Sequence, residues 1–397
     1  MRFVYRALCA VALAGCADVK GPVETKPPSL SPQDPGQDPS DPNPHSTLDP
    51  RSLADQLEAM YGGRVAKVSI PPDAFSQFSD AVHPDIACPP ADWNGARCWL
   101  LYTPYKNSDP SNENPAFLFA SSDTTWVTPP QVQNPLIPYP GIQGYNSDPD
   151  HAYDPATGRL VQVYRVVSDS FNKIMMMSTR DARTWTTPVL AFQERNHDAI
   201  SPALVLERDR TAKVWYVKSG TDGCVATQST VALRTAQPDS DSRYERSTWS
   251  GAAPVQLSIP GYVVWHLDVL KISESRGYLA MIAAFQRYSN CANSDVWLAS
   301  SADGVTWRTY ALPLFSRSMK LAKQLGLTTW YRGTLRYDSQ TDTIHFWPSG
   351  MTKTTWGVYH ATAKLSDLLD LLSIAQPSDF QPPALSQSIN RVPVLVP

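Results

Sequence analysis

The sequence contains little charge and no basic block. Only 18% of its 397 residues are charged, and the formal net charge is −3. A nucleic-acid-binding surface needs clustered Lys and Arg, so we expect no nucleic-acid partner. Glycine is also scarce, with 19 residues against 36 prolines, and much of the proline lies near the two ends. With 42% hydrophobic residues the chain can bury a sizeable core, and its length allows one to three domains.

No long apolar run is present at the N-terminus. The run from Ala7 to Ala14 is too short to span a bilayer, and Arg2 and Arg6 precede it. With Leu13-Ala14-Gly15-Cys16, this segment resembles a bacterial lipoprotein signal. The resemblance implies that residues 1–15 are removed, that Cys16 is lipidated, and that the protein is anchored in the bacterial cell envelope rather than membrane-spanning. The alternative is an ordinary secretory signal with an incidental cysteine.

Proline-rich segments flank the central part of the chain. Residues 16–50 combine proline with Ser, Asp and Gln, a composition that cannot bury enough apolar surface to fold. We expect a disordered tether there. Residues 377–397 are expected to form a Pro-rich strap over the surface.

Cys-x-x-Cys pairs are missing, which argues against a thiolate metal site. If Cys9 is removed and Cys16 is lipidated, four cysteines remain, and an even number in an exported protein favours disulfides. Four cysteines allow three pairings. We predict a local Cys88–Cys98 bridge and a Cys224–Cys291 bridge between neighbouring repeats, because the latter two lie in polar loops after comparable strands.

Helical patterns are almost absent. One short helix is expected over residues 52–61, with Ser52 as its cap and Gly62-Gly63 at its end. The rest consists of short β-branched and aromatic runs separated by Gly, Pro, Asn and Asp, which is typical of an all-β repeat fold.

One turn sequence recurs along the chain. Its complete form is Ser301-Ala302-Asp303-Gly304-Val305-Thr306-Trp307, and looser copies end at Trp126, Trp185 and Trp249, 58 to 64 residues apart. It resembles the Asp-box of sialidase-type β-propellers. Such a period corresponds to one four-stranded blade, and the Asp-box acids Asp123, Asp181 and Asp303 are expected to be structural.

Aligning the repeats gives five units, so the chain is predicted to be a five-bladed β-propeller over residues 51–376. A strand within residues 65–70 is expected to complete the last blade, since a closed ring needs its edges paired. A short helix is expected at residues 366–372.

Polar residues interrupt the first strand of every unit. In a propeller these strands line the central channel, so their side chains are expected to converge on a polar, hydroxylated ligand. With nearby loop and strand residues, the candidate binding set is His83, Asp85, Glu113, Asp148, His151, Arg165, His197, Ser201, Trp265, His266, Tyr331 and Arg332.

The stretch Ser147-Asp148-Pro149-Asp150 stands before a strand, and Asp198 stands at the equivalent place in the next unit. These acids resemble the first-strand acids of five-bladed glycoside hydrolases of the arabinanase and levansucrase type. The resemblance implies that Asp150, or Asp148, is the base, that Asp198 is the modulator, and that Asp268 occupies the general-acid region. No glutamate stands near Asp268, so the acid would be Asp268, His266 or Glu113. A sialidase is a poorer match, because only Arg165 and Arg332 are available for its arginine cluster and no F-R-I-P-like stretch occurs.

Two functions therefore stay open. A glycoside hydrolase would act on an extracellular glycan through Asp150, Asp198 and Asp268, with carboxylates about 5–5.5 Å apart for retention or about 6.5–9.5 Å for inversion. A non-catalytic glycan-binding or scaffolding lipoprotein would use the same channel, with Trp265, Trp330 and Tyr331 stacking on sugars. A metal held by His151, His197 and His266 is a third possibility. No motif implies a cofactor, although a structural calcium ion is compatible with the fold, and a monomer is expected.

Overall fold

Five four-stranded antiparallel sheets follow one another along the chain and form a ring. The computed structural model describes residues 50–375, apart from 63, 73–79, 91, 111–112, 139, 141–143, 169–170 and 242. The predicted signal, Cys16, the tether up to residue 49 and the strap lie outside the described residues. Among the described helices, none is long and apolar enough to cross a membrane.

Each sheet is one propeller blade, which confirms the predicted five-bladed β-propeller. The strands are β2 (Ala81–Ala87), β3 (Trp99–Pro104), β4 (Ala116–Ser122) and β5 (Thr125–Val127) in blade 1; β6 (Gly144–Asp154), β7 (Arg159–Ser168), β8 (Phe171–Thr179) and β9 (Val189–Arg195) in blade 2; β10 (Ile200–Leu206), β11 (Ala212–Lys218), β12 (Thr230–Ala236) and β13 (Ala253–Val255) in blade 3; β14 (Tyr262–Ser273), β15 (Gly277–Gln286), β16 (Ser294–Ser301) and β17 (Arg308–Thr309) in blade 4; and β18 (Thr329–Asp338), β19 (Thr343–Met351), β20 (Trp356–Lys364) and β1 (Ala66–Lys67) in blade 5.

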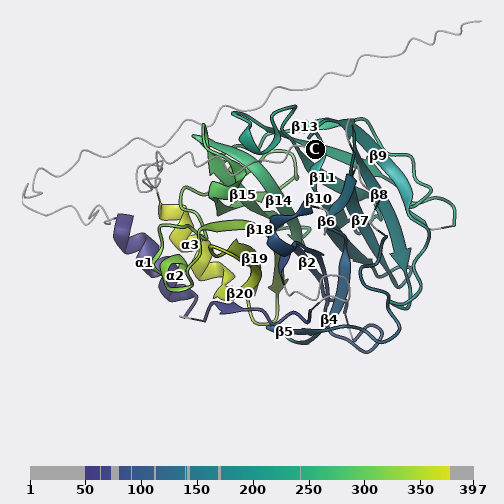
Figure 1. The fold of residues 1–397 in the computed structure, drawn as a ribbon, viewed down its shortest axis with the longest axis horizontal. Helices are drawn as coiled ribbons and strands as arrows, with labels where there is room; N and C mark the ends of the chain where they lie inside the picture. The colour runs from purple at the N-terminus through teal and green to yellow at the C-terminus, as the bar shows by residue number, and fades with distance from the viewer. Residues whose placement is uncertain are drawn as a thin grey trace, which may run out of the picture. The chain divides into compact units, whose positions relative to one another are not determined.

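The first strand of each blade faces the centre of the ring. Strands β2, β6, β10, β14 and β18 surround the centre, and each contacts the first strands of both neighbouring blades (Figure 1). Apolar side chains between the blades form the core, which is typical of stacked sheets that each bury two faces.

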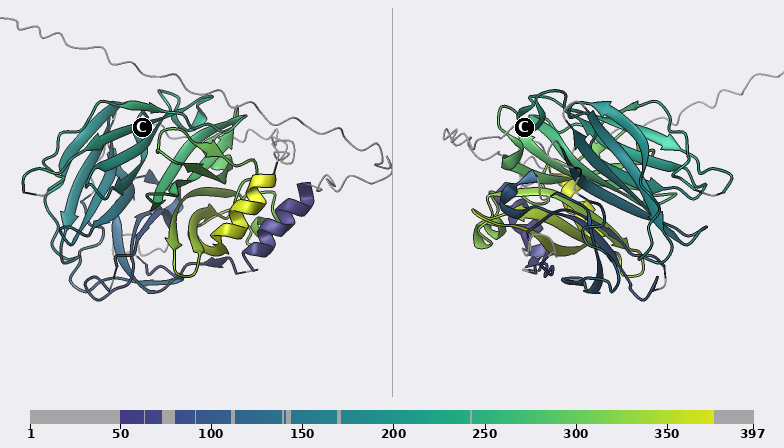
Figure 2. Two further views of the ribbon diagram at one scale, coloured as in Figure 1. Left: turned by 180° about the vertical axis from the view of Figure 1, so that it is seen from behind. Right: turned by 45° about the vertical axis from the view of Figure 1, so that its right-hand side comes forward.

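The helices lie beside the last blade. Helix α1 (Pro50–Met60) packs along α3 (Leu365–Ile374), as Figure 2 shows, and a short α2 (Lys320–Gln324) lies near them. Leu53, Leu57 and Tyr61 are buried, and the Tyr61 hydroxyl donates to the Leu314 carbonyl at 2.9 Å. The predicted cap Ser52 lies inside α1, because the helix begins at Pro50.

The N-terminal strand closes the ring, as predicted. Strand β1 pairs with β20, and the Val68 amide donates to the Val358 carbonyl at 2.8 Å. The chain then reaches blade 1, where the Ser69 amide donates to the Thr124 carbonyl at 2.7 Å and Ser69 accepts from the Trp126 amide at 3.0 Å. One short segment thus bonds to both the last and the first blade.

The turn from Ser301 to Trp307 connects the third and fourth strands of blade 4. Asp303 Oδ1 accepts the Val305 and Thr306 amides at 2.7 and 2.8 Å, and Gly304 has a φ of +76°. A Cβ at Gly304 would lie 2.7 Å from Trp215 of blade 3, whose indole N–H donates to the Gly304 carbonyl. The turn is therefore a structural joint between two blades.

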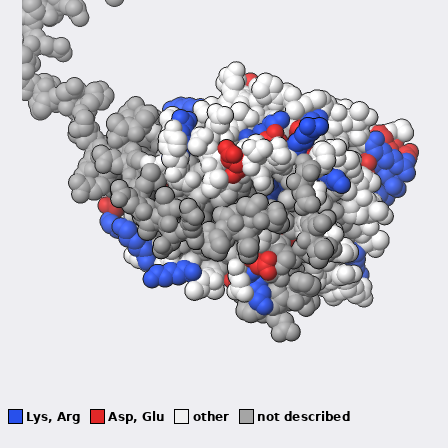
Figure 3. Space-filling model, turned by 45° about the horizontal axis from the view of Figure 1, so that its top comes forward, with Lys and Arg blue, Asp and Glu red and all other residues white. Residues whose placement is uncertain are grey.

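Both predicted disulfides are confirmed. Cys88 and Cys98 are bridged within blade 1, and Cys224 is bridged to Cys291 between the loops of blades 3 and 4. These two loops carry the short 3₁₀ turns η3 (Gly223–Val225) and η4 (Cys291–Asn293). Charge is spread over the described surface visible in Figure 3, where acidic and basic side chains are interspersed.

Replacing Ser69 by proline tests the closure. Ser69→Pro removes the amide that bonds Thr124, so we expect the free energy of unfolding to fall by about 1–3 kcal/mol. Ser69→Ala keeps the amide and serves as the matched control, since the Ser69 side chain is exposed. Urea denaturation of both variants is the measurement, and equal stabilities would contradict this role for the segment.

Candidate functional site

A bulge occurs at the same level in the first strand of all five blades. The strand register shifts between Val82 and Asp85 in blade 1, and equivalent shifts occur in the other four blades. His83, Asp148 and Ser201 occupy the bulge in three blades, with φ values of 50°, 49° and 53°, and a proline follows each of them. Proline has no amide to pair, so it suits a broken ladder. The bulges turn these side chains into the channel.

Two imidazoles and one carboxylate meet at this level. His83, Asp148 and His266, called here the histidine layer, offer ligand atoms that lie within 4.8 Å of one another. His83 Nδ1 lies 3.2 Å and His266 Nδ1 lies 3.8 Å from Asp148 Oδ1. All three side chains are buried.

The layer combines an ionised acid with neutral histidines. Burial opposes the charge on Asp148, but Arg165 and the two histidines outweigh it and hold its pKa well below the usual range. Arg165 Nε lies 3.1 Å from Asp148 Oδ2, which also accepts the Ser201 amide. Burial lowers the pKa of His83 to about 3, and burial also lowers the pKa of His266. His83 Nε2 and both ring nitrogens of His266 have no hydrogen-bond partner among the described residues.

A buried acid and several phenols surround the layer. Burial raises the pKa of Glu113 to about 8, although Ser147 and Arg165 favour its charged form. The Tyr331 ring packs edge-on against His266 with centroids 4.5 Å apart, and its hydroxyl accepts the Trp265 indole N–H at 2.6 Å. Burial raises the pKa values of Tyr331 and of two further tyrosines, so their phenols stay protonated; these are Tyr105 and Tyr145.

A second set of acids lies two residues further along the strands. Asp85, Asp150 and Asp268, called here the carboxylate layer, are buried, with ligand oxygens within 4.8 Å of one another. Each accepts a backbone amide from the next blade: His151 at 2.6 Å, Leu204 at 2.9 Å and Leu335 at 3.2 Å, respectively. Blades are thus joined through these carboxylates.

Arg332 and the shared burial set the charge of the carboxylate layer. Arg332 Nη2 donates to Asp150 Oδ2 at 3.0 Å and to the Pro202 carbonyl at 3.3 Å. Burial and the neighbouring Asp85 raise the pKa of Asp150, and the same two causes raise that of Asp268 to about 6. One cation among three acids favours a shared proton, because adjacent carboxylates cannot all ionise in a buried site.

Most predicted residues line the channel, but two lie apart. Asp198 accepts the Gly220 amide at 2.8 Å and lies 3.8 Å from Lys218 Nζ, with its side chain about 24% exposed. His197 is half-buried against Gly223, where a Cβ would lie 2.9 Å from its ring. His151 is buried beside Asp85, with its Nδ1 against the carboxylate. The three histidines considered for a metal therefore do not converge, and His83 with Asp148 accompanies His266 instead.

Sequence reasoning missed the tyrosines 105 and 145 and the hydroxyl of Ser147. Ser147 donates to Asp148 at 3.3 Å, and the Arg165 guanidinium lies 5.8 Å from the centre of the Tyr145 ring. In the sequence, the bulged level is indicated by a proline that directly follows each of the residues 83, 148 and 201.

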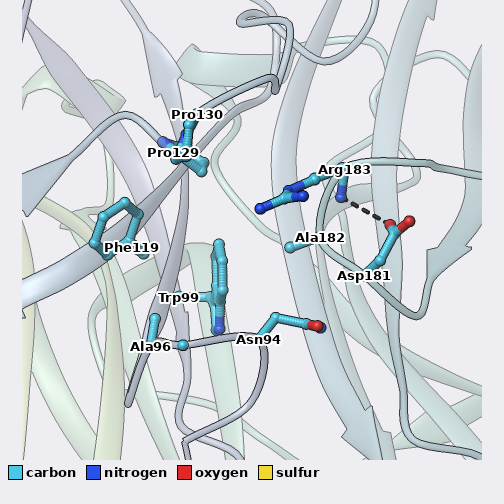
Figure 4. A pocket seen from close by; sticks show the side chains of 10 residues that line it. Asn94, Ala96, Trp99, Phe119, Pro129, Pro130, Asp181, Ala182 and Arg183 are labelled. Atoms are coloured by element: carbon cyan, nitrogen blue, oxygen red, sulfur yellow. Dashed lines mark hydrogen bonds between the residues drawn. The ribbon is translucent and has the colours of Figure 1, made fainter.

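A separate cavity of about 400 Å³ lies between blades 1 and 2. Figure 4 shows Trp99 and Phe119 on one wall and the Asp181–Arg183 turn on the other. Asn94, in the loop before β3, donates to the Arg180 carbonyl at 2.9 Å. The cavity contains none of the predicted site residues and lies near the turns at the far ends of the first strands.

The chain is similar in sequence to a curated bacterial protein. It is 22% identical over 271 residues to the A type blood N-acetyl-alpha-D-galactosamine deacetylase of Flavonifractor plautii, a match covering 59% of this chain and 35% of that protein. The chain thus spans about a third of the length of the curated relative it matches. No protein-family model matches the chain.

Solved structures share the five-bladed ring. The crystal structure of an N-acetylgalactosamine deacetylase from F. plautii in complex with blood group B trisaccharide has a TM-score of 0.68 and 21% identity, and the match covers 78% of this chain and 97% of that one. A thermostable family-43 glycoside hydrolase has a TM-score of 0.52 at 13% identity, with 74% of this chain and 91% of that chain covered. The Penicillium chrysogenum α-L-arabinanase with arabinobiose has a TM-score of 0.50 at 12%, covering 76% and 99%. At these identities the likeness establishes the fold.

The raised pKa of Glu113 predicts a pH-dependent stability. Burial favours the protonated form of Glu113 in the folded state. The contribution of Glu113 to the free energy of unfolding is therefore complete below about pH 4.5, the ordinary pKa of a glutamate, and is lost as the pH rises through about 8. Glu113→Gln stays neutral throughout. We therefore expect the stability of Glu113→Gln relative to wild type to increase between pH 5 and pH 8.

The measurement is urea unfolding of both proteins at each pH. Other titrating groups are common to the two proteins and cancel in the difference. A difference that stays constant with pH would show that Glu113 does not titrate in this range.

Proposed function

We propose that this protein hydrolyses the N-acetyl group of an amino sugar in an extracellular glycan, with the histidine layer as its centre. The observation that carries the proposal is the convergence of two neutral imidazoles and one ionised carboxylate on one point of the channel. Unpaired buried nitrogens are costly unless they bind something.

The donor set fits a divalent metal ion. Two histidine nitrogens and one carboxylate oxygen are the ligands of many catalytic zinc sites, and the unpartnered His83 Nε2 and His266 nitrogens are available to bind. Asp148 keeps its second oxygen on the Ser201 amide and beside Arg165, which orients the carboxylate. A bound ion would supply Lewis acidity for the amide carbonyl and a water of lowered pKa.

The chain's own residues would then move the protons. Glu113 can take a proton from the attacking water and give it to the departing amine, because its pKa of about 8 lies close to neutral pH. Water oxygen bonds to the acetyl carbon, the carbon–nitrogen bond breaks, and acetate and a free amine result. The protonated phenols of Tyr105, Tyr145 and Tyr331 can donate to sugar oxygens and pack against the ring.

Similarity to the F. plautii protein supports this choice, since that protein is an N-acetyl-alpha-D-galactosamine deacetylase and shares the ring. The predicted paired-carboxylate glycoside hydrolase receives less support. Asp85, Asp150 and Asp268 crowd together, with one oxygen of each within 4.8 Å of the others. Their oxygens are also engaged by backbone amides of the next blade.

Replacing His266 separates the two chemistries. His266→Gln removes a proposed metal ligand, so acetate release from glycans that carry N-acetylgalactosamine or N-acetylglucosamine should fall to below about 1% of wild type. His197→Gln is the control, because that histidine lies outside the layer. Acetate is measured by an enzyme-coupled assay and new reducing ends by a separate colorimetric assay.

Two results would contradict the deacetylase, and a third would contradict its location in the histidine layer. Reducing ends without acetate, lost in Asp150→Asn, would support the glycoside hydrolase. Glycan binding on an array without either product would support a non-catalytic binding propeller. Acetate release unaffected by His266→Gln would move the chemistry away from the histidine layer.

We also propose that the protein is lipid-anchored through Cys16, on the strength of the Leu13-Ala14-Gly15-Cys16 sequence. In a bacterial host, wild type should incorporate labelled fatty acid and enter the detergent phase, while Cys16→Ser should do neither. Label in the Cys16→Ser variant, or its absence from wild type, would exclude anchoring at this position.

A further inference from the structure

A second group of two histidines and one acid lies where the last blade meets the first. Asp123, His345 and His360, called here the seam cluster, offer ligand atoms within 4.8 Å of one another. His345 comes from β19, His360 from β20 and Asp123 from the turn between β4 and β5. Three segments from the two ends of the ring therefore supply one residue each, on the side of the far ends of the first strands.

Asp123 differs from the equivalent acids of the other turns. Asp303 and Asp181 each accept two backbone amides within their own turn, Asp181 from Arg183 at 2.9 Å and Thr184 at 2.7 Å. The turn of Asp123 is one residue shorter, and no such bond forms there among the described residues. Its carboxylate is directed to the two histidines of blade 5 instead.

The two imidazoles are held with their nitrogens facing each other. His345 Nδ1 and His360 Nε2 are 3.1 Å apart. Trp347 stacks on both rings, with centroids 5.5 Å from His345 and 4.8 Å from His360, and its indole N–H donates to the Asp123 carbonyl at 3.1 Å. Both histidines are only 8% exposed, and burial lowers their pKa values, so they are neutral at physiological pH.

We propose that the seam cluster is a second metal site, one that binds a divalent transition ion of the Zn²⁺ class and ties blade 5 to blade 1. Two imidazole nitrogens and one carboxylate oxygen suit Zn²⁺, with solvent in the remaining position. Binding would displace the proton shared between His345 Nδ1 and His360 Nε2, which leaves to solvent.

Arg336 opposes metal binding, so its replacement has an expected direction of effect on metal affinity. Its Nη2 lies 2.9 Å from His345 Nε2, so in the metal-free state the guanidinium donates to that nitrogen. A metal on Nδ1 requires the proton on Nε2, which would face the guanidinium. Removing this cation should therefore tighten metal binding.

The position of the site gives it a structural role. His360 lies opposite Ala66 of β1, and the turn that carries Asp123 also bonds Ser69 through Thr124. A metal here would link the same strands that the N-terminal segment joins by hydrogen bonds. Because the ion binds only the closed ring, it should raise thermal stability by mass action.

Zinc stoichiometry distinguishes this site from the one in the proposed function. Tag-free protein is dialysed against Zn²⁺ and its bound metal is counted. We expect two ions in wild type, one in His266→Gln, one in Asp123→Asn or His360→Gln, and none in the double variant His266→Gln/His360→Gln. Asp123→Asn is the safer variant, since that side chain is half-buried and the change keeps its shape.

In the His266→Gln background, Zn²⁺ should raise the melting temperature, and adding Asp123→Asn should remove that shift. In the same background Arg336→Met should lower the Kd for Zn²⁺ by about tenfold. Unchanged stoichiometry in both seam variants, or an Arg336→Met variant that binds Zn²⁺ no better, would overturn the seam site. An unchanged count in His266→Gln would count only against the central metal.

Discussion

The ring depends on carboxylates that bond across blade boundaries inside the channel. Asp85, Asp150 and Asp268 each accept an amide from the next blade, one residue beyond the equivalent position in that blade. The same geometry that joins the blades packs three acids together. A backbone amide bonded to a carboxylate is a strong, directional contact, but the crowding makes complete ionisation costly, and Arg332 offsets part of that cost through Asp150. The carboxylate layer therefore has a structural role, although its residues resemble catalytic acids in the sequence.

The proposed chemistry lies in the histidine layer rather than in the carboxylate layer. A bulge in each first strand turns His83, Asp148 and His266 towards one another, while Arg165 and the Ser201 amide hold one side of the Asp148 carboxylate. Left-handed backbone at His83, Asp148 and Ser201 is unfavourable for residues with a side chain. Backbone strain of this kind persists where the surrounding sheet holds the residue in place, and it is common at functional sites. The two layers lie two residues apart along the strands. The carboxylate layer joins the blades, whereas the histidine layer contains unpaired ring nitrogens.

Much of the fold could be predicted from the sequence because its repeat is local. The spacing of Trp126, Trp185, Trp249 and Trp307 defines a blade, and the need to cover a sheet edge predicts the pairing of an N-terminal strand with β20. The structure places most of the predicted first-strand acids and histidines around the channel and Asp198 and His197 outside the central cluster, while their part in binding or catalysis stays a prediction. Their division into two levels could not be predicted, because it depends on bulges that change which side chains share a height. The seam cluster could not be predicted either, because its residues are 15 to more than 200 positions apart in the sequence and meet only when the ring closes.

Closure by β1 also constrains the order of folding. The edge of the last blade is covered by a strand made near the start of the chain, so neither has its partner until nearly all of the domain has been synthesised. Blades 1 to 4 complete their own sheets from consecutive strands, but the join between blade 5 and blade 1 is a contact of very long sequence separation, and such contacts form late because the loop must close first. A chain that ends within blade 5 therefore lacks the partner of β1, so a sheet edge stays open at each end of the ring.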